Sequence, residues 1–359
     1  MIKSLSLSNF RNFEQATLPS LSSSVVLIGD NGQGKSSLLE AIFLLSNLRS
    51  FRTSNLKELR KLGAENFSAC CDVLRKGSWT TRLEFRADGF SKQLRIDGIP
   101  ITKASDFVRK FKTVAFLPDD PILVSGPSNI RRHFLDMFIS MVSKEYFSAI
   151  QKYYNALKSR NFMLKTGKFD GAVIASFDSV MASSGARVNS ERRLFISMLS
   201  EVMTKNIVEI KPELAKINLK LKCPVEFDGE AVFLDRLSKD LPKDRQKGFT
   251  SFGPHLDDFE ISIDSKNLRN YGSRGQCRIA SLCLKLAEFE IVLSSMDGAD
   301  SVVIVDDSTG DLDQKTKDAF FERISKASQV FYAFTSDPQE QTLKASQRFK
   351  INDAKITME

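Results

Sequence analysis

The sequence has few cysteines and histidines and no long apolar run. Its five cysteines are an odd number without C-x-x-C spacing, and it has only two histidines. These features argue against a disulfide framework and a zinc site, and they favour a reducing compartment. The longest apolar runs, such as AIFLL at 41–45, are far shorter than a membrane span. The segment MIKSLSLSNF lacks the apolar region of a signal peptide, so we expect a cytoplasmic protein.

The composition is that of a globular protein with excess positive charge. Of 359 residues, 27% are charged and 42% hydrophobic, and 52 Lys+Arg against 44 Asp+Glu give a net charge of +8. This length allows two compact units, or one domain with a large insertion. The charge favours a polyanionic partner, although a merely basic protein would have the same balance.

Residues 25–37, VVLIGDNGQGKSS, place glycines and a lysine between an expected strand and an expected helix. They fit G-x-x-x-x-G-K-[ST]. In such a loop, backbone N–H groups surround an anion, the lysine reaches the β/γ-phosphates and the serine hydroxyl ligates Mg²⁺. An ordinary glycine-rich turn is the alternative, but the flanking elements favour nucleotide binding. The predicted binding residues of the loop are Gly29, Asp30, Asn31, Gly32, Gln33, Gly34, Lys35, Ser36 and Ser37.

The hydrophobic pattern divides the chain into thirds. The first third contains short expected strands such as TTRLEFRA, the middle third is helical, and the last third alternates strands and helices. We therefore predict an α/β fold in which the first and last thirds form one nucleotide-binding core around a mixed sheet. The predicted bounds are 1–120 and 248–359 for this ATPase lobe, and 121–247 for an inserted α-helical lobe.

The apolar segment SVVIVDD ends in two carboxylates. A P-loop fold places the end of this strand beside the phosphate loop. Asp306 is then a candidate Mg²⁺ ligand together with Ser36, and Asp307 a candidate to orient or deprotonate the attacking water. Alone, the pair would equally suit a solvated strand end. With the phosphate loop upstream, we predict Lys35, Asp306 and Asp307 as the catalytic residues.

The segment YGSRGQCR contains S-x-G-Q at the start of an expected helix, formed by Ser273, Gly275 and Gln276. A helix N-terminus with a hydroxyl and a glycine suits a γ-phosphate. A simple helix cap is the alternative. Because Lys35 already serves one nucleotide, this second anion site suggests that a second copy of the chain completes the nucleotide site.

Taken in order, these segments resemble the ATP-binding-cassette ATPases: phosphate loop, S-x-G-Q signature, acidic strand end, and GDLD with Asp311 and Asp313 as the D-loop. Further segments resemble the RecF family of bacterial recombinational repair proteins: LSLSNFRNFEQATL, SFRT, GPSNIRRHFLD, SFGPHLDDFEI and YGSRGQCR. The matching segments run to about Asp313, with the stretch between Lys144 and Lys247 only loosely matched. The resemblance implies an ABC-type ATPase core with an inserted helical lobe.

The resemblance also implies a function in DNA repair, replication and the SOS response. ATP with Mg²⁺, sandwiched between two subunits, would drive dimerisation on double-stranded DNA near single-strand gaps, and slow, DNA-stimulated hydrolysis would release it. At the nucleotide, it implies contributions from Ser273, Gly275, Gln276 and Asp313. It further implies RecR and RecO as partners in loading RecA, and a nucleoid-associated location. No sustained heptad region separates the ATPase segments, so we expect no long coiled-coil arm.

The chain departs from the family pattern at several positions. Leu256 occupies the place of the arginine in the usual GPHRDD. STGDLD replaces the usual serine-glutamate arrangement before the D-loop, and Thr335 stands at the switch position where many transporter ATPases have histidine. These departures predict weak hydrolysis. The segment VAFLPDD, with Asp119 and Asp120, is a candidate Q-loop.

Positive residues gather in three segments that are candidates for contacting DNA phosphates. They equally suit solvated helix faces, and Arg131 and Arg132 equally suit pairing with acidic residues. No base-reading motif is visible, so we expect binding insensitive to base sequence. The residues are Arg49, Arg52, Lys57, Arg60, Lys61, Arg131, Arg132, Lys152, Lys158, Arg160, Lys165 and Lys168.

Three other functions compete with a DNA-stimulated ATPase. A nucleotide-switched recruitment module would show little or no DNA-stimulated hydrolysis. A transporter ATPase subunit is disfavoured by the helical lobe and the basic charge. An OLD-type nuclease is disfavoured because the chain after Phe334 has no room for a nuclease domain.

Overall fold

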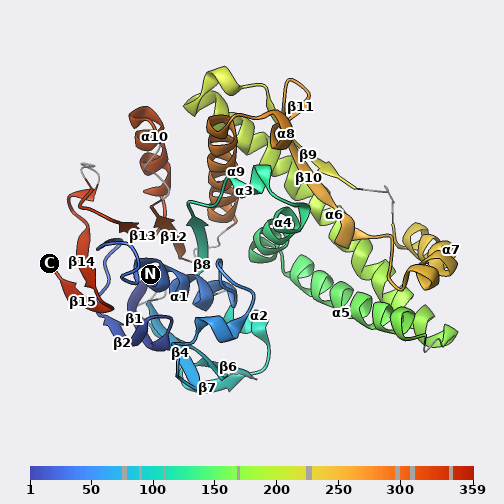
Figure 1. Ribbon diagram of the computed structural model, residues 1–359, viewed down its shortest axis with the longest axis horizontal. Coiled ribbons are helices and arrows are strands. Elements are labelled where there is room, and N and C mark those ends of the chain that lie inside the picture. Colours follow the sequence, from blue (N-terminus) through green and yellow to red (C-terminus); the bar gives the residue numbers. More distant parts are fainter. Residues whose placement is uncertain are drawn as a thin grey trace. The chain divides into compact units, whose positions relative to one another are not determined.

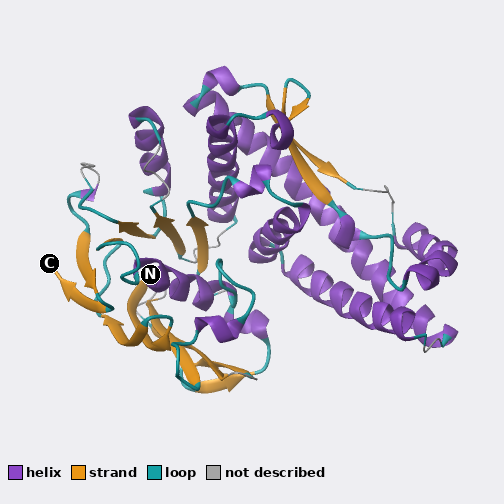
Figure 2. Cartoon of the chain, in the orientation of Figure 1, coloured by secondary structure: helices purple, strands orange, loops and turns teal. Residues whose placement is uncertain are grey.

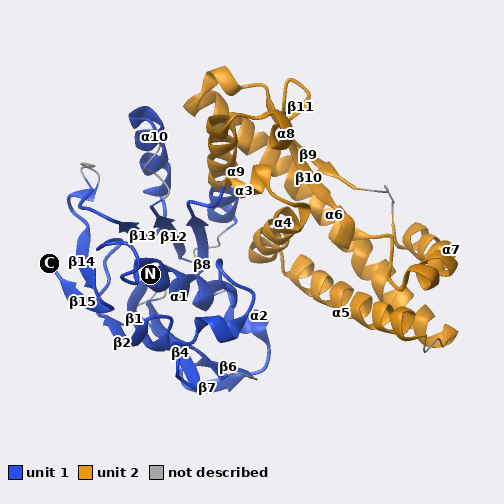
Figure 3. Ribbon diagram, in the orientation of Figure 1, with its two compact units in different colours: residues 1–120, 288–359 blue, residues 121–287 orange. Residues whose placement is uncertain are grey.

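The computed structural model describes residues 1–74, 79–88, 91–108, 110–167, 170–223, 229–295, 300–307, 312–338 and 343–359 (Figure 1). The chain divides into two compact units, residues 1–120 with 288–359 and residues 121–287 (Figure 3). The first boundary lies at the residue expected from the sequence. The second unit extends beyond residue 247, where we expected the helical lobe to end.

A strand pairing explains why residues 248–287 belong with the helical unit. β10 (Asp258–Ile263) pairs antiparallel with β9 (Ile217–Lys222) and with β11 (Lys266–Asn267), in the order β11-β10-β9. The alternation in DDFEISID predicts this strand, but we expected it in the ATPase lobe. Its partner β9 precedes α7 (Glu230–Lys247) in the chain, and such a distant pairing leaves no signal in the local pattern.

A mixed six-stranded sheet in the order β15-β14-β3-β13-β12-β8 carries the phosphate-loop motif of the first unit. Five strands are parallel, and only β15 is antiparallel to its neighbour. Parallel strands are buried on both faces, which explains the continuous apolar runs VVLI and SVVIV. The strands are β3 (Ser24–Ile28), β8 (Lys112–Phe116), β12 (Ser301–Asp306), β13 (Gln329–Phe334), β14 (Gln347–Asn352) and β15 (Lys355–Met358).

The helix α1 (Lys35–Asn47) packs between this sheet and a second, antiparallel sheet of the same unit (Figure 2). Only Ser36 and Asn47 of the helix are not buried. The second sheet has the order β2-β1-β4-β5-β6-β7. Its strands are β1 (Ile2–Phe10), β2 (Phe13–Leu18), β4 (Asn66–Leu74), β5 (Thr80–Asp88), β6 (Lys92–Ile96) and β7 (Ile99–Ile101). The unit also contains η1 (Leu56–Leu59), α2 (Ala104–Phe107) and α10 (Gln314–Ile324).

The second unit is mainly helical, as the middle of the sequence predicts (Figure 2). Together the two units confirm the predicted α/β class, with a phosphate-loop core and a helical insertion. The helical elements are α3 (Ile122–Ser125), α4 (Ser128–Val142), α5 (Lys144–Thr166), α6 (Gly171–Ile210), η2 (Pro212–Leu214), α7, η3 (Pro254–Leu256), α8 (Leu268–Tyr271) and the start of α9 (Arg274–Ser294). Across the described ranges, no helix is long and apolar enough to cross a membrane.

A buried arginine links three helical-unit segments. Arg160 of α5 is 0% exposed, and its Nε donates to Asp178 Oδ1 of α6 at 2.6 Å. Its Nη1 donates to Asp244 Oδ2 of α7 and to Thr250 Oγ1, each at 2.8 Å. The prediction that Arg160 is a candidate for DNA contact is therefore wrong. A charged side chain inside this core is tolerated because carboxylates compensate it.

Arg131 and Arg132 make contacts inside the protein, as the alternative to DNA contact predicts. Arg131 is 4% exposed, and its Nε and Nη2 donate to the two carboxylate oxygens of Asp258 at 2.6 and 2.8 Å. Arg132 Nη1 donates to the carbonyl of Asp257 at 2.8 Å. Of the remaining predicted cations, Lys168 lies outside the described residues.

We predict that Arg160→Ala lowers the free energy of unfolding by about 3–5 kcal/mol, because it leaves two buried carboxylates without their cation. Burial already raises the pKa of Asp178, and Arg160 opposes that rise. Urea unfolding followed by circular dichroism measures the change. Lys158→Ala, at an exposed position of the same helix, is the control and should shift stability by less than about 0.5 kcal/mol. Equal effects would contradict the role of the buried pairs.

Candidate nucleotide-binding site

The phosphate loop takes its shape from segments packed against its glycines. The loop runs from Gly29, after β3, to Gly34, before α1. Gly34 has φ 117°, and a Cβ there would lie 2.6 Å from Phe13 Cζ and 2.7 Å from Asn12 Nδ2. A Cβ at Gly29 would collide with the carbonyl oxygen of Ile351 in β14. Both motif glycines therefore lie where neighbouring atoms leave no room for a Cβ, the Ile351 backbone at Gly29 and the Asn12 and Phe13 side chains at Gly34.

Lys35 is held inside the loop by the loop's own carbonyls. The residue is 6% exposed, and its Nζ donates to the carbonyl oxygens of Gly29 at 2.5 Å and Asp30 at 2.8 Å. Loss of solvent lowers the pKa of Lys35, while the carboxylates of Asp306, Asp307 and Asp30 oppose that shift. The ammonium group is thus held by two loop carbonyls, and a phosphate oxygen would be a stronger acceptor than either carbonyl.

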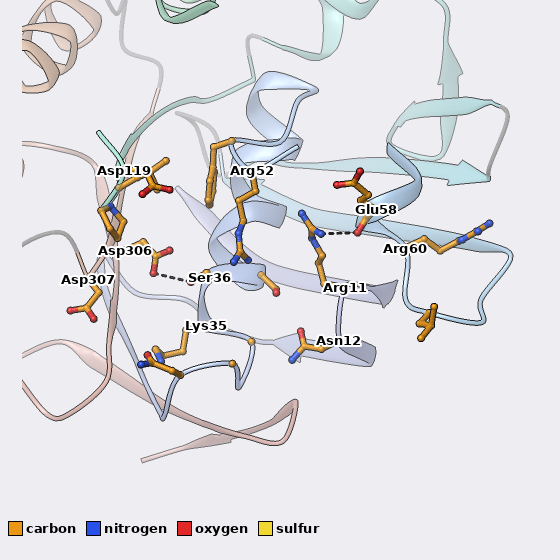
Figure 4. A pocket seen from close by; sticks show the side chains of 18 residues that line it. Arg11, Asn12, Lys35, Ser36, Arg52, Glu58, Arg60, Asp119, Asp306 and Asp307 are labelled. Atoms are coloured by element: carbon orange, nitrogen blue, oxygen red, sulfur yellow. Dashed lines mark hydrogen bonds between the residues drawn. The ribbon is translucent and has the colours of Figure 1, made fainter. Parts of the chain in front are cut away.

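Ser36 and Asp306 face each other across the site (Figure 4). Ser36 Oγ donates to Asp306 Oδ1 at 3.0 Å. Burial raises the pKa of Asp306, and the Ser36 hydrogen bond and the charges of Arg52 and Lys35 partly offset the rise. Hydroxyl and carboxylate oxygens are ligands that Mg²⁺ accepts, with water and phosphate completing its octahedron. Over the described parts of the chain, no cluster of three or more His, Cys, Asp or Glu forms a self-sufficient metal site.

Asp307 differs from its neighbour in conformation and exposure. It is exposed, has φ 42°, and its N–H donates to the carbonyl of Ala333 in β13 at 3.1 Å. A non-glycine residue in this left-handed region is uncommon and often marks a functional position.

A pocket of about 900 Å³ surrounds these groups within the first unit (Figure 4). Its walls include the phosphate loop, the end of β12, Asp119 after β8 and the turn between β1 and β2. Arg52 and Arg60, which we grouped with possible DNA contacts, line this pocket. The sequence interpretation assigned no site role to the following lining residues: Arg11, Asn12, Phe51, Glu58, Leu62, Leu117 and Pro118.

The missed residues Arg11 and Asn12 hold the turn between β1 and β2 in place: Asn12 contacts the phosphate loop, and Arg11 contacts α1 and η1. Arg11 Nε and Nη2 donate to both carboxylate oxygens of Glu40 at 2.8 and 2.7 Å, and Glu40 is fully buried in α1. Arg11 Nη1 donates to the carbonyl of Glu58 at 2.8 Å, and Asn12 Nδ2 donates to the carbonyl of Gln33 at 3.0 Å. The FRNF segment carried a family resemblance, but no local pattern indicated these contacts.

The signature residues lie at the N-terminus of α9, in the second unit. Ser273 Oγ accepts from the Gln276 N–H at 3.2 Å, and Gln276 Oε1 accepts from the Ser273 N–H at 2.8 Å. This reciprocal pair is a capping box, so the helix-cap interpretation holds at least structurally. Gly275 lies between them, exposed in the first turn of α9.

The other predicted positions are spread over the chain. Asp313 caps α10, because its side chain accepts from the Thr316 N–H and hydroxyl, each at 3.0 Å. Asp311 lies outside the described residues. Thr335 is exposed directly after β13, and Asp120 Oδ2 accepts from the Leu117 N–H at 2.9 Å.

Comparisons with known proteins match the chain over nearly its whole length. Residues 1–357 match the RecF/RecN/SMC N-terminal domain. The chain is 33% identical over 347 residues to the DNA replication and repair protein RecF of Ruminiclostridium cellulolyticum, covering 94% of this chain and 93% of that one. It is 34% identical over 369 residues to the protein of the same name from Caldanaerobacter subterraneus subsp. tengcongensis, covering 100% of each. The solved structure of the recombination mediator protein RecF-ATP in the RecFOR pathway has a TM-score of 0.89 and 30% identity, covering 100% of this chain and 97% of that one.

We predict that Gly34→Ala weakens binding of a fluorescent ATP analogue at least about 100-fold, because a methyl group there meets Asn12 and Phe13 in a left-handed backbone. Gly32→Ala is the matched control: its φ is 81°, but nothing lies within 4 Å of the added Cβ. Gly32→Ala should lower the binding free energy of the ATP analogue by about 1 kcal/mol, which is roughly a five-fold loss of affinity. Circular dichroism confirms folding of both variants. Similar losses would show that packing against the β1–β2 turn does not shape the loop.

Proposed function

Because the chain belongs to the RecF/RecN/SMC N-terminal domain family, we propose that it is an ATP-binding recombination mediator of the RecF type. In this proposal, ATP drives two copies together on double-stranded DNA near single-strand gaps, and slow hydrolysis releases them. The observation that carries it is the arrangement of Lys35, Ser36 and Asp306 around one pocket at the phosphate loop. Similarity to relatives named RecF supports RecR and RecO as partners in loading RecA.

The side chains of the pocket have distinct proposed tasks. Lys35 exchanges its loop carbonyls for phosphate oxygens and neutralises their charge. Ser36 and Asp306 hold Mg²⁺, which when bound supplies further neutralisation of the phosphates. Asp307 orients the attacking water, and its exposure is compatible with that task. The loop residues from Gly29 to Ser37 supply backbone N–H groups.

Completion of the site by a second copy is the second part of the proposal. Ser273, Gly275 and Gln276 would approach the nucleotide held by the other copy, with Asp313 nearby, as the family resemblance implies. The capping box at α9 places a hydroxyl and a helix N-terminus together, and this combination attracts a phosphate. A nucleotide bound in this way joins two chains.

Contact with DNA is proposed to be electrostatic and independent of base sequence. Lys152, Lys158 and Lys165 of α5 are exposed, and the net charge is +8. Lysine contacts to phosphates release counterions, so affinity should fall as salt rises. Arg131 and Arg160 are excluded from this surface by burial.

Sedimentation velocity with ATP, with ADP and without nucleotide tests ATP-driven pairing. We expect only ATP, and not ADP, to raise the particle mass, by at least a doubling over the nucleotide-free protein, because only the triphosphate reaches both the loop and the signature. Ser273→Arg should abolish the doubling while one chain binds ATP within about two-fold of the parent affinity. Ser105→Arg adds the same charge at an exposed position of the first unit and should pair normally. Normal pairing of Ser273→Arg would refute the contribution of the signature in trans.

ATP turnover with and without duplex DNA separates the proposal from the recruitment module. The departures at STGDLD and Thr335 predict weak hydrolysis, so we expect low basal turnover that DNA accelerates several-fold. Lys35→Arg should retain part of the ATP binding and lose at least about ten-fold in turnover. The reason is that a planar guanidinium does not fit where the ammonium group contacts the Gly29 and Asp30 carbonyls. Unchanged turnover in this variant would contradict the assignment of Lys35. Absence of acceleration by DNA would favour the module.

A further inference from the structure

The second unit contains the long helix α6 (Figure 1). Along this helix, a stripe of side chains at heptad spacing is exposed. The other faces of the helix pack on α5, α7 and β9 within the second unit. Four apolar side chains of the stripe are 39–56% exposed: Val173 39%, Val180 42%, Leu194 56% and Val208 48%. The stripe consists of Val173, Val180, Arg187, Leu194, Glu201 and Val208, each seven residues after the last. An apolar helix face repeated every seven residues is the geometry of helix pairing.

A second column of small polar side chains lies three residues after each stripe position. It consists of Ser176, Ser183, Ser190, Ser197 and Thr204. The hydroxyls of Ser176 and Ser183 donate to the carbonyls of Val173 and Val180 at 2.7 and 3.3 Å. Because their own helix satisfies them, these side chains can be covered at small cost. This face lacks the usual coiled-coil pattern of two apolar positions per heptad, because the second of its two columns carries hydroxyl side chains.

The stripe is symmetric about Leu194. Arg187 and Glu201 lie seven residues to either side, and Val180 and Val208 lie fourteen to either side. In an antiparallel pair with a twofold axis at Leu194, Arg187 meets Glu201 of the second copy and Val180 meets Val208. A parallel pair would instead place like charges together. The charges therefore select one orientation.

Within one chain, Arg187 and Glu201 cannot pair with each other. Fourteen residues of helix span about 21 Å. Arg187 is half exposed and contacts Glu191, with Nη2 2.7 Å from Oε1. Lys144, Glu145 and Lys152 line a groove beside Arg187, so a carboxylate arriving there would meet predominantly positive charge.

We infer that the exposed stripe of α6 is a self-association surface, which pairs antiparallel with the same stripe of a second copy. The contact uses no residue of the phosphate loop or signature, so it forms without nucleotide. Each copy contributes three apolar side chains to the interface, Val180, Leu194 and Val208, and the two copies form two Arg187-Glu201 pairs. A chain with this contact and a separate nucleotide-dependent contact has two different twofold interfaces, which allow assemblies larger than a dimer.

Cysteine cross-linking tests the position of the axis. Leu194→Cys places two thiols at the axis, so a short bis-maleimide should give covalent dimer without nucleotide. Val173→Cys is the control, because its counterpart would be residue 215, beyond the end of α6. The parent chain measures the background from its own cysteines, of which all but Cys223 are buried. We expect at least ten-fold more dimer from Leu194→Cys than from Val173→Cys. Equal yields of cross-linked dimer from the two variants would contradict a twofold axis at Leu194.

Charge reversal tests the partner of Arg187. Glu201→Arg should raise the dimer dissociation constant at least ten-fold in sedimentation equilibrium without nucleotide. In this variant, Arg187 of each copy would face an arginine at position 201 of the other copy, and the two cations repel. The double variant Arg187→Glu with Glu201→Arg should restore pairing, and only contact between copies explains such a rescue. Circular dichroism melts check that the helix remains folded.

The same measurements in a Ser273→Arg background keep the two interfaces apart, since the α6 contact should persist there. Failure of ATP-driven pairing alone would leave this inference standing. A parent chain that stays monomeric up to high concentration, or a double variant that does not recover, would overturn it. The inference would also be overturned if Glu201→Arg weakened only the binding of a different protein and left self-association unchanged. The stripe would then be a binding surface for that protein.

Discussion

Close packing of neighbouring segments against two glycines holds the phosphate loop in its shape. The turn between β1 and β2 lies against Gly34, and β14 lies against Gly29, so neither position has room for a side chain. The same turn carries Arg11, whose two hydrogen bonds to buried Glu40 attach it to α1. Lys35 begins that helix. The chemistry at the phosphate loop therefore depends on packing that starts outside the motif.

The helical unit is organised by buried charges rather than by apolar contacts alone. Arg192 is fully buried, and its Nη1 donates to the Pro254 carbonyl at 2.6 Å and to Asp257 Oδ2 at 2.9 Å. Its Nη2 donates to Asp136 Oδ1 at 2.7 Å. The GPHLDD segment thus joins α4 and α6 through a carbonyl and a carboxylate. Leu256, which replaces the usual arginine, is 37% exposed and takes no part in these bonds.

Motifs with a local mechanism were predictable, and contacts between distant segments were not. The loop around Lys35 and the acidic end of β12 are recognisable because their spacing reflects strand, turn and helix. Arg160 belonged to a basic cluster by sequence, yet it is an internal ion-pair centre, because burial depends on which helices pack around it. Asn12 gave no signal, since its hydrogen bond to the Gln33 carbonyl joins two separate parts of the chain.

The sequence by itself determined the phosphate loop, the order of the ATPase motifs and the helical insertion, because each is written in residues close together along the chain. Only the tertiary structure decided that the segment around β10 joins the helical unit, and that Arg52 and Arg60 line the nucleotide pocket. It also decided which face of α6 stays exposed. The reason is that strand pairing and burial depend on residues far apart in sequence, whose meeting no local pattern records.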